Sequence, residues 1–491
     1  MGSPCNYGRW IGWGASLLIS NKVFTNRLTF TCVPTHGLVP PCQQFCFPGT
    51  SSLHILHLTF YLIKIMKSHY DVIVIGGGQS GLSMSYLLKE KGIDHVVFEK
   101  KKIADSWRSF RWDTFCLVTP NWQCNLPGYS YTGNDPYGFM VKDDIVDFID
   151  KYVESFDPPV IEGIDVLSVE KSDTTELYEV NTSDGVYFTK QVVVCTGNYH
   201  SAPLPKLAEK FPSTITHIHS AHYKNPSELP EGEVLVVGTG QSGSQIAEDL
   251  HLEGRKVHLC VGNAPRCARV YRGKDVVEWL DKMQYYDLPV ERHPEGENVR
   301  EKTNHYVTGR DGGREIDLRK FALEGMQLYG PLTNSDNGLL SFDPNLKANL
   351  DYADKVSENI KMKIDKYIAA NEIEAPIERA YQPAWEPVEE ITELALANSG
   401  ITSVVWCIGF GHDFTWIKLP VLGERGFPVH KRGITEIPGL YFLGLTWQNT
   451  WGSARFSGVG KDAEYLLETI EKQLNVKSET LTCVINASTQ M

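Results

Sequence analysis

The sequence predicts an α/β fold with two doubly wound domains, the second inserted in the first. The main observation is a repeat: a short apolar run leads into a glycine-rich turn and then a helix at residues 71–90, and again at residues 234–252. Apolar runs that end at glycines are typical of buried parallel strands. A chain of 491 residues is also long enough for two or three domains. Each repeat has the pattern of a Rossmann-like, dinucleotide-binding domain.

The first repeat has a glycine at each position where a dinucleotide-binding turn needs one. Gly76 makes the tight turn out of the strand, Gly78 lets backbone N–H groups approach a pyrophosphate, and Gly81 lets the helix pack on the sheet. Glu99 closes the next predicted strand, where a carboxylate accepts hydrogen bonds from a ribose. The alternative is a plain strand–helix turn without a ligand. We predict that the first dinucleotide is bound by Gly76, Gly78, Gln79, Ser80, Gly81 and Glu99.

The second repeat differs in the residues that follow its second strand. No acidic residue closes the strand at Lys256–Cys260, and Arg266 stands nearby, with Arg269 and Arg272 after it. A guanidinium can pair with the 2′-phosphate of NADPH, which a carboxylate would repel. The alternative is that these arginines form a solvated surface cluster. We predict NADPH at this turn, bound by Gly238, Gly240, Gln241, Ser242, Gly243 and Arg266.

The remaining segments extend this plan along the chain. Strands are predicted within Val166–Phe188, Ser403–Ile408 and Leu440–Leu443, and helices over Asp143–Phe156, Tyr352–Ala370 and Gly460–Lys472. The first domain is expected at residues 66–200 and 396–473, and the second domain, with an insertion, at residues 201–395. A polar tail is expected at residues 474–491.

Residues 1–65 are expected to be a separate leader, disordered or foreign to the native protein. From Met1 to Tyr70 the chain has no Asp or Glu but five basic residues. Such a composition is typical of an organelle transit peptide. We favour the alternative that Met66, directly before the first strand, is the natural start. The apolar run Leu53–Met66 is short for a membrane span and contains His and Lys, so no span is expected.

Charge and cysteine content narrow the function classes. The net charge of −13 argues against a nucleic-acid-binding protein, which needs a basic surface. The seven cysteines after the leader are dispersed, with neither a C-x-x-C pair nor a zinc-like spacing, so we expect no metal site. Reduced, buried thiols indicate a reducing compartment. We therefore expect the protein in the cytoplasm, or in an organelle if the leader is a transit peptide.

Several segments outside the glycine turns carry a further pattern. They are Ser106-Trp107-Arg108, Leu117–Trp122, the linkers Cys195-Thr196-Gly197 and Cys407-Ile408-Gly409, Gly439–Gly444 and Gly458–Ala463. With them, the chain from Tyr70 to about Gln473 resembles the class B flavin monooxygenase-like superfamily, which includes flavin-containing and Baeyer–Villiger monooxygenases and the plant YUCCA enzymes. The resemblance implies that the first dinucleotide is FAD and that Ser106, Trp107, Arg108 and Gly444 help to bind it.

The same resemblance makes Asn121 the candidate catalytic side chain, near the flavin C4a position. The alternative is that Asn121 caps a turn. Family members pass hydride from NADPH to FAD, and the monooxygenases then activate O2 as a flavin C4a-hydroperoxide that oxygenates a small organic substrate. That intermediate must be shielded from water. Trp447, Trp451 and Phe456 are candidates for a dry wall, although a plain core would use them equally well.

One segment departs from the monooxygenase signature F-x-G-x-x-x-H-x-x-x-(F/Y). Here Ser213 and Ile215 replace the Phe and Gly, while His219 and Tyr223 keep the last two positions. We expect His219 to be a structural residue near the domain junction. The departure keeps two alternatives to oxygenation open: an NADPH-dependent flavoprotein reductase or dehydrogenase, and a non-catalytic redox sensor that binds FAD and NADPH. A disulfide reductase is disfavoured because it needs a redox-active cysteine pair.

Overall fold

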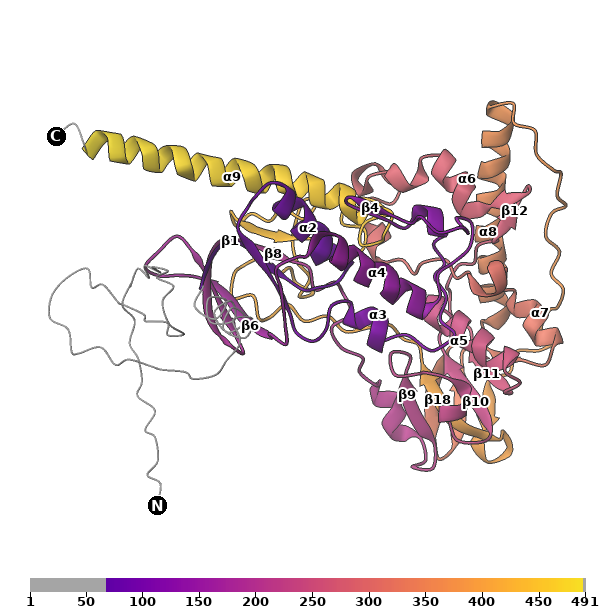
Figure 1. The fold of residues 1–491 in the computed structure, drawn as a ribbon. Coiled ribbons are helices and arrows are strands. Elements are labelled where there is room, and N and C mark those ends of the chain that lie inside the picture. Colours follow the sequence, from indigo (N-terminus) through magenta and orange to yellow (C-terminus); the bar gives the residue numbers. More distant parts are fainter. Residues whose placement is uncertain (1–67, 489–491) are drawn as a thin grey trace, which may run out of the picture. The chain divides into compact units, whose positions relative to one another are not determined.

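The computed structural model describes the backbone of residues 68–488 and the side chains of residues 68–475. The leader expected at residues 1–65, and Met66 as a start, lie outside these residues. From His69 on, the chain forms one compact unit. It has the mixed α/β fold predicted from the sequence, with two sheets whose central strands are parallel (Figure 1). No helix in the described part of the chain is long and apolar enough to cross a membrane.

The first sheet is built around β1 (His69–Ile75), which has β2 (His95–Glu99) and β8 (Gly185–Val194) as parallel neighbours. Its strand order is β5-β2-β1-β8-β7-β6, and the end of β8 also pairs with β19. The other strands are β5 (Val160–Glu162), β6 (Val166–Lys171), β7 (Tyr178–Thr182) and β19 (Leu440–Phe442). Because β6, β7 and β8 pair antiparallel, the sheet is parallel around β1 and antiparallel at one edge.

Alternating side chains of β1 enter two different cores. Val72 and Val74 pack in the core formed by α2 (Gln79–Glu90), α4 (Lys142–Phe156) and the first part of α9, helices that lie together in Figure 1. Ile73 and Ile75 pack on the other face, with side chains from β6, β7 and residues 414–421. Burial on both faces explains why this strand is an uninterrupted apolar run.

Helix α9 begins where the sequence predicts and ends later. It was expected over Gly460–Lys472, whereas the structure has it from Val459 to Ser488, shown in yellow in Figure 1. The polar tail expected from residue 474 on is therefore helical backbone as far as Ser488. Residues 473–488 contain no Gly or Pro, so the sequence offers no stop signal after Lys472.

The second sheet is built around β10 (Glu233–Val237), which lies between β11 (Val257–Cys260) and β18 (Ile401–Trp406). Its strand order is β14-β11-β10-β18-β9, and every pair is parallel. The outer strands are β9 (Thr216–His219) and β14 (Gln327–Tyr329). Helix α5 (Gln241–Leu252) follows the second glycine turn and packs on Val234 and Val236 of β10.

Strand β18 corrects the boundary that the sequence placed at residue 396. It lies between β10 and β9, so the chain stays in the second sheet through Trp406. The chain returns to the first sheet with β19. A buried parallel strand has the same apolar sequence in either sheet, and therefore the sequence did not show to which sheet β18 belongs.

The chain between β11 and β18 adds short elements to the second sheet. They are the hairpin β12 (Val270–Tyr271) and β13 (Lys274–Asp275), α6 (Val276–Lys282), α7 (Leu318–Leu323), α8 (Leu346–Ala370), and the antiparallel strands β15 (Leu332–Asp336), β16 (Leu339–Phe342) and β17 (Glu393–Ala395). Helix α8 is the helix predicted over Tyr352–Ala370, with an earlier start. Short elements elsewhere are α3 (Asp105–Ser109), β3 (Asn125–Leu126) and β4 (Tyr129–Ser130).

Short 3₁₀ helices complete the described chain. Three precede the second glycine turn: η1 (Asn121–Gln123), η2 (Lys206–Lys210) and η3 (Pro226–Glu228). The others are η4 (Tyr285–Asp287), η5 (Val290–Arg292), η6 (Gly296–Glu301), η7 (Arg310–Gly312) and η8 (Leu396–Asn398). The η4–η6 segment matters for function, because its residues line a cavity described below.

Candidate functional site

The first glycine turn, between β1 and α2, leaves no room for a side chain at two of its glycines. Gly76 has φ +110°, and a Cβ there would lie 2.7 Å from the carbonyl oxygen of Cys195. A Cβ on Gly81 would overlap the carbonyl oxygen of Gly76. Cys195 directly follows β8, so the turn is pressed against the end of the neighbouring strand. These two glycines are required by the fold itself.

Gly78 and Glu99 form the open side of the same turn. A Cβ on Gly78 would meet no atom within 4 Å, so the fold does not require glycine there. No side chain caps the first turn of α2, which leaves the positive end of this helix to an anion. Glu99 accepts hydrogen bonds from the N–H groups of Gly77 (2.6 Å) and Lys101 (2.9 Å), and burial raises the pKa of its carboxyl. The free space and the uncapped helix fit a pyrophosphate.

The C-terminal part of the chain closes on this turn. The side-chain amide of Gln79 accepts a hydrogen bond from the indole N–H of Trp107 (3.0 Å) and donates one to the carbonyl oxygen of Ala454 (3.0 Å). Gly444 lies so close to α2 that a Cβ there would overlap the side chain of Ser80. Segments far apart in the sequence, which the resemblance assigns to the first cofactor, are thus brought together at the start of α2.

The second glycine turn, between β10 and α5, repeats this geometry. Gly238 has φ +102°, and a Cβ there would lie 2.7 Å from the carbonyl oxygen of Cys407, which follows β18. A Cβ on Gly243 would overlap the carbonyl oxygen of Gly238. At Gly240 the nearest atom would be 3.6 Å away, and no side chain caps α5. The second turn therefore also presents an open helix end suited to a phosphate group.

One cavity of about 1430 Å³ reaches both glycine turns. Ten of the predicted site residues line it: Gly76, Gly78, Gln79, Ser80, Glu99, Ser106, Trp107, Gln241, Ser242 and Gly444. It is lined by residues at the ends of β1 and β2 and by residues at the start of α5. Two dinucleotides bound at the two helix ends would therefore share one enclosure, in which one cofactor can react with the other.

Aromatic side chains form part of the cavity wall. Trp447, Trp451 and Phe456 all line it, and Trp447 and Phe456 are almost completely buried. Phe456 stacks on Trp107 with ring centroids 5.6 Å apart, and Tyr286 of η4 lies 4.7 Å from Trp451. These are the aromatic residues that the sequence offered as a wall or a plain core. Their position at the cavity suits them to keep water out of it.

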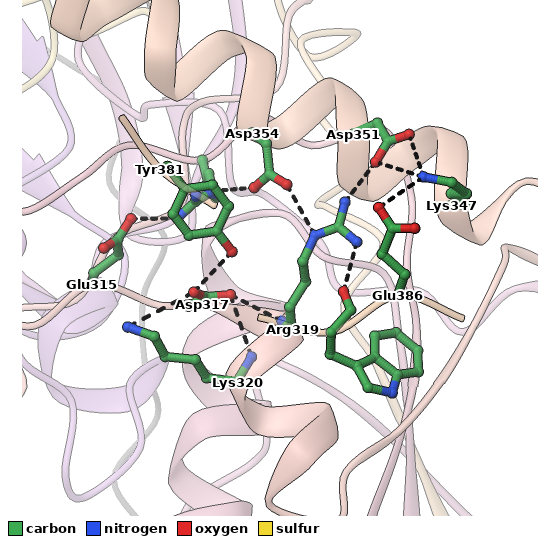
Figure 2. Close-up of polar contacts among 11 residues, drawn as sticks. Glu315, Asp317, Arg319, Lys320, Lys347, Asp351, Asp354, Tyr381 and Glu386 are labelled. Carbon is green, nitrogen blue, oxygen red and sulfur yellow. Dashed lines mark hydrogen bonds and ion pairs between the residues drawn. The ribbon is translucent and has the colours of Figure 1, made fainter. Parts of the chain in front are cut away.

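Arg266 does not reach the cavity, and this corrects its assignment to the second cofactor. Its side chain is 2% exposed and forms ion pairs with Glu315 and, through Nε at 2.7 Å, with Asp354. Asp354 also pairs with Arg319 at 2.9 Å, and Figure 2 shows the carboxylate of Asp354 turned toward Arg319. Because two carboxylates already neutralise Arg266, its guanidinium is not free to bind a phosphate. Since the side chain is buried, it does not belong to a solvated surface cluster, which was the alternative.

A different cation lies at the wall of the cavity. Lys363 of α8 lines the cavity and has no carboxylate partner among the described residues. It neighbours His305, whose pKa burial and the charge of Lys363 lower to about 4. The segment that holds His305 contacts the second turn, since Gln241 donates a hydrogen bond to the carbonyl oxygen of Val307 at 2.6 Å. Sequence reasoning missed Lys363 because α8 brings it in from far along the chain.

Asn121, the predicted catalytic residue, does not line the cavity. Its Nδ2 donates to the carbonyl oxygen of Asp135 (2.9 Å) and its Oδ1 accepts from the N–H of Met140 (3.0 Å). Both ends of the amide are used, and the side chain is 4% exposed. Asn121 therefore fixes the loop at residues 135–140, close to the alternative of a turn-capping role. Gln123 of the same 3₁₀ helix lines the cavity instead, and sequence reasoning missed it.

Arg108 also lies away from the cavity. It pairs with Asp150 of α4, and its Nε donates to the carbonyl oxygen of Ile103 at 2.9 Å. The side chain is thus held at the protein surface by the first domain's own residues. Its neighbour Arg111 lines the cavity and was not predicted as a site residue. Arg108 thus points away from the cavity, while Trp107 and Arg111 line it.

His219 has the structural position expected of it. Its Nδ1 accepts a hydrogen bond from the N–H of Ala221 (3.1 Å), so Nε2 carries the proton and donates to the carbonyl oxygen of Gly409 (2.7 Å). Burial lowers the pKa of its imidazole, which favours this neutral form. His219 thereby ties the end of β9 to the linker that follows β18.

Known proteins resemble this chain in sequence and in fold. The family model of the pyridine nucleotide-disulphide oxidoreductases matches residues 73–325. A CzcO-like uncharacterized oxidoreductase from Geobacillus kaustophilus is 34% identical over 409 residues, which cover 82% of this chain and 99% of that protein. The probable indole-3-pyruvate monooxygenase YUCCA4 from Arabidopsis thaliana is 29% identical over 195 residues, 39% of this chain and 47% of its own length.

The fold is similar to that of a flavin-containing monooxygenase from Stenotrophomonas maltophilia, with a TM-score of 0.56 and 19% sequence identity over 83% of this chain and 99% of the other. Together these matches confirm the resemblance to the class B flavin monooxygenase-like superfamily and the prediction of an oxidoreductase. The family model covers more than half of the chain, and the Geobacillus relative is matched over nearly its whole length. The chain belongs to the pyridine nucleotide-disulphide oxidoreductase family.

Proposed function

We propose that this chain is an FAD-containing, NADPH-dependent monooxygenase that uses O2 to oxygenate a small organic substrate. The first sheet forms the FAD domain, and the second sheet forms an NADP domain inserted between β8 and β19; both are Rossmann-like. The observation that supports this most strongly is the single cavity that reaches both glycine turns. A protein that bound only one nucleotide would have no use for the second uncapped helix end on the same cavity.

The residues of this chain bind and orient the cofactors. The free N–H groups at the start of α2 would hold the FAD pyrophosphate next to Gly78, and the carboxylate of Glu99 would bind the adenosine ribose. The start of α5 and Gly240 would hold NADPH in the same way. When bound, FAD accepts hydride from NADPH and reacts with O2, a redox chemistry that side chains do not supply.

Exclusion of water is the second task of the protein. Trp447, Trp451 and Phe456 line the cavity with apolar surface, and Trp107 stacks on Phe456. An oxygenating flavoprotein needs such a wall, because water that enters the site allows the activated oxygen to be released as hydrogen peroxide before it reaches the substrate. A reductase that passes electrons on directly has less need of it. The aromatic wall therefore favours oxygenation over the reductase and dehydrogenase alternative.

The preference for NADPH now depends on Lys363 rather than Arg266. Lys363 lines the cavity without a carboxylate partner in the described part of the chain, close to His305. An unpaired ammonium group can bind the 2′-phosphate that distinguishes NADPH from NADH. The direct comparison of both nucleotides is the test of this assignment.

Thiol chemistry is disfavoured as the function of the site. Cys195 and Cys267 line the cavity, but burial raises the pKa of both thiols, that of Cys267 to about 12. Disulfide exchange requires a thiolate, so neither is suited to it. The six cysteines of the described residues are free thiols, which favours a reducing compartment such as the cytoplasm.

The decisive experiment follows reduction and oxygenation separately. The purified protein is mixed anaerobically with NADPH, and bleaching of the flavin absorbance reports hydride transfer. The reduced protein is then exposed to ¹⁸O₂ with candidate amines, sulfides and ketones, and mass spectrometry reports the label in the product. Flavin reduction followed by label in the product is the expected result. Fast reduction that only yields hydrogen peroxide with every substrate would favour the reductase, and no NADPH oxidation at all would favour the redox sensor.

A further inference from the structure

Part of the cavity forms a chamber with aromatic and aliphatic walls, made by the η4–η6 segment and the loop before α9. Its lining residues are Tyr286, His293, Val299, Trp447, Trp451 and Arg455. Trp447 packs with Val299 in a small apolar core of its own, and the rings of Tyr286 and Trp451 lie 4.7 Å apart. None of these six residues belongs to a glycine turn, although Ala454, next to Arg455, accepts a hydrogen bond from Gln79 of the first turn.

Arg455 is the cation of the chamber. Its guanidinium lies over the ring of Trp451, 3.7 Å from the centroid, and donates to the carbonyl oxygen of Trp451 and, at 3.2 Å, to Oδ1 of Asn304. These are its hydrogen-bond partners among the described residues, and neither is charged. A guanidinium has five N–H donors, so several of them remain available on the cavity side.

Arg455 differs in this respect from the buried arginines of the insertion. Arg266, Arg269 and Arg319 are each held by one or two carboxylates. Arg455 has no carboxylate partner in the described part of the chain, and burial lowers the pKa of its guanidinium to about 10. Arg455 is half-buried and lines the cavity, so an anion that enters the cavity can serve as its counter-ion.

A second arginine of the cavity also lacks a carboxylate partner, but it lies at the first glycine turn. The guanidinium of Arg111 is 4.8 Å from the ring of Trp107, whose indole N–H binds Gln79. Arg111 is thus close to the expected FAD site, where the cofactor's own phosphates can neutralise it. The guanidinium of Arg455 lies instead over Trp451, where an anion that enters the chamber can pair with it.

We propose that the chamber binds the substrate, and that the substrate is an organic anion whose carboxylate pairs with Arg455 while its apolar or aromatic body packs on Trp447, Trp451 and Tyr286. A planar carboxylate matches the two parallel N–H donors of a guanidinium. The stacking of Arg455 on Trp451 holds the guanidinium in one orientation before the substrate arrives. The substrate class rests on the proposed function, since it assigns the chamber to the substrate of the same monooxygenase.

The test compares two ligands of the same shape that differ in charge. Phenylacetate and phenylacetamide are titrated by isothermal calorimetry into the purified, FAD-bound protein and its variants Arg455→Gln and Arg455→Lys. Arg425→Gln is the matched control, because Arg425 is an exposed arginine that pairs with Glu301 outside the cavity. FAD content and thermal melting of each variant show whether the protein remains folded.

The wild type and Arg425→Gln are expected to bind phenylacetate about 10- to 100-fold more tightly than phenylacetamide, the range for a charge-assisted hydrogen bond. Arg455→Gln should lower that ratio to about threefold or less, and Arg455→Lys should keep part of it, because lysine preserves the charge but not the planar fork. A wild type without preference would overturn the proposal. So would a preference that survives in folded Arg455→Gln.

Two further outcomes separate this proposal from its alternatives. If Arg455→Gln slows flavin reduction by NADPH but keeps the wild-type ligand ratio, Arg455 serves the flavin and the substrate assignment is wrong. If Arg455→Gln does not fold, Arg455→Lys decides. A ratio of phenylacetate to phenylacetamide affinity equal to that of the wild type would overturn the proposal, and a lower ratio would support it. Calorimetry measures binding alone, so failure to incorporate labelled oxygen would refute the monooxygenase and leave the carboxylate preference as a separate result.

Discussion

Replacing Gly78 and replacing Gly81 with alanine should impair the protein in two different ways, although both residues belong to one turn. A Cβ on Gly78 meets no atom within 4 Å, and the backbone there has an ordinary φ of −82°. Gly78→Ala should therefore change the free energy of unfolding of the apoprotein by less than about 1 kcal/mol, because a small capping loss is offset by a less flexible unfolded chain. The new methyl group instead occupies the space that a pyrophosphate would use.

The magnitudes of the two effects follow from the same contacts. Forcing an extra methyl group into an occupied space costs about 1–3 kcal/mol, which corresponds to FAD binding about 5- to 150-fold weaker in Gly78→Ala. In Gly81→Ala the methyl group overlaps the carbonyl oxygen of Gly76, a backbone atom at the end of β1 that cannot rotate away. The free energy of unfolding should fall by at least about 1–3 kcal/mol, and the apparent Tm by roughly 2–10 °C.

The assay measures FAD affinity and stability on the same samples. Flavin fluorescence during titration of the apoprotein gives the dissociation constant for FAD, and thermal melting of the apoprotein gives its stability. Gly240→Ala is the counterpart in the second turn: it should weaken NADPH binding while FAD is retained, because Gly240 also has free space at its Cβ position. If Gly78→Ala bound FAD as tightly as the wild type, the pyrophosphate could not lie at the start of α2, and the reasoning would be refuted.

Three further predictions concern charged residues. Arg266→Met should lower the free energy of unfolding by about 3 kcal/mol, because it leaves Glu315 without its partner and Asp354 with Arg319 alone, and melting curves should show this with an unchanged NADPH-to-NADH ratio of kcat/KM. Lys363→Ala should raise the KM for NADPH about tenfold and leave that for NADH unchanged in steady-state assays, and equal effects on both would exclude a contact with the 2′-phosphate. Burial and Arg300 lower the pKa of His430 from 6.5 to about 4. Between these pH values the unfolded chain protonates first, so stability should fall as pH falls, and His430→Gln should flatten the pH dependence of Tm.

The glycine turns could be predicted from the sequence because their geometry is local. An apolar strand, three glycines at fixed spacing and a helix follow one another in the chain. The first and third glycines lie against the backbone of the same turn or of the neighbouring strand, and the middle glycine faces open space. Even the alternation of Val72 and Ile73 between two cores follows from a strand buried on both faces. The elements that lie in sequence order were therefore predicted well, with errors at the ends of α8 and α9.

The cations could not be assigned from the sequence because their partners are remote. Arg266 follows the second repeat closely, which made it a candidate for a phosphate, yet its partners are Glu315 and Asp354 from two other elements. Arg455 is equally ordinary in the sequence, and its importance comes from the absence of any carboxylate near it in the folded, described chain. Proximity in sequence indicates which residues follow a strand, whereas the charge balance of an arginine depends on tertiary packing.

The two glycine turns also argue jointly for a protein that uses two cofactors. In each turn the first and third glycines are required by backbone contacts, to Cys195 and Gly76 in one and to Cys407 and Gly238 in the other. In each turn the middle glycine is the N-cap of the helix and touches nothing that would exclude a side chain. A fold alone explains four of these six glycines. The middle two are explained by ligands that approach the backbone closely, and because one cavity reaches Gly78 in the first turn and Gln241 and Ser242 in the second, those ligands would meet in it.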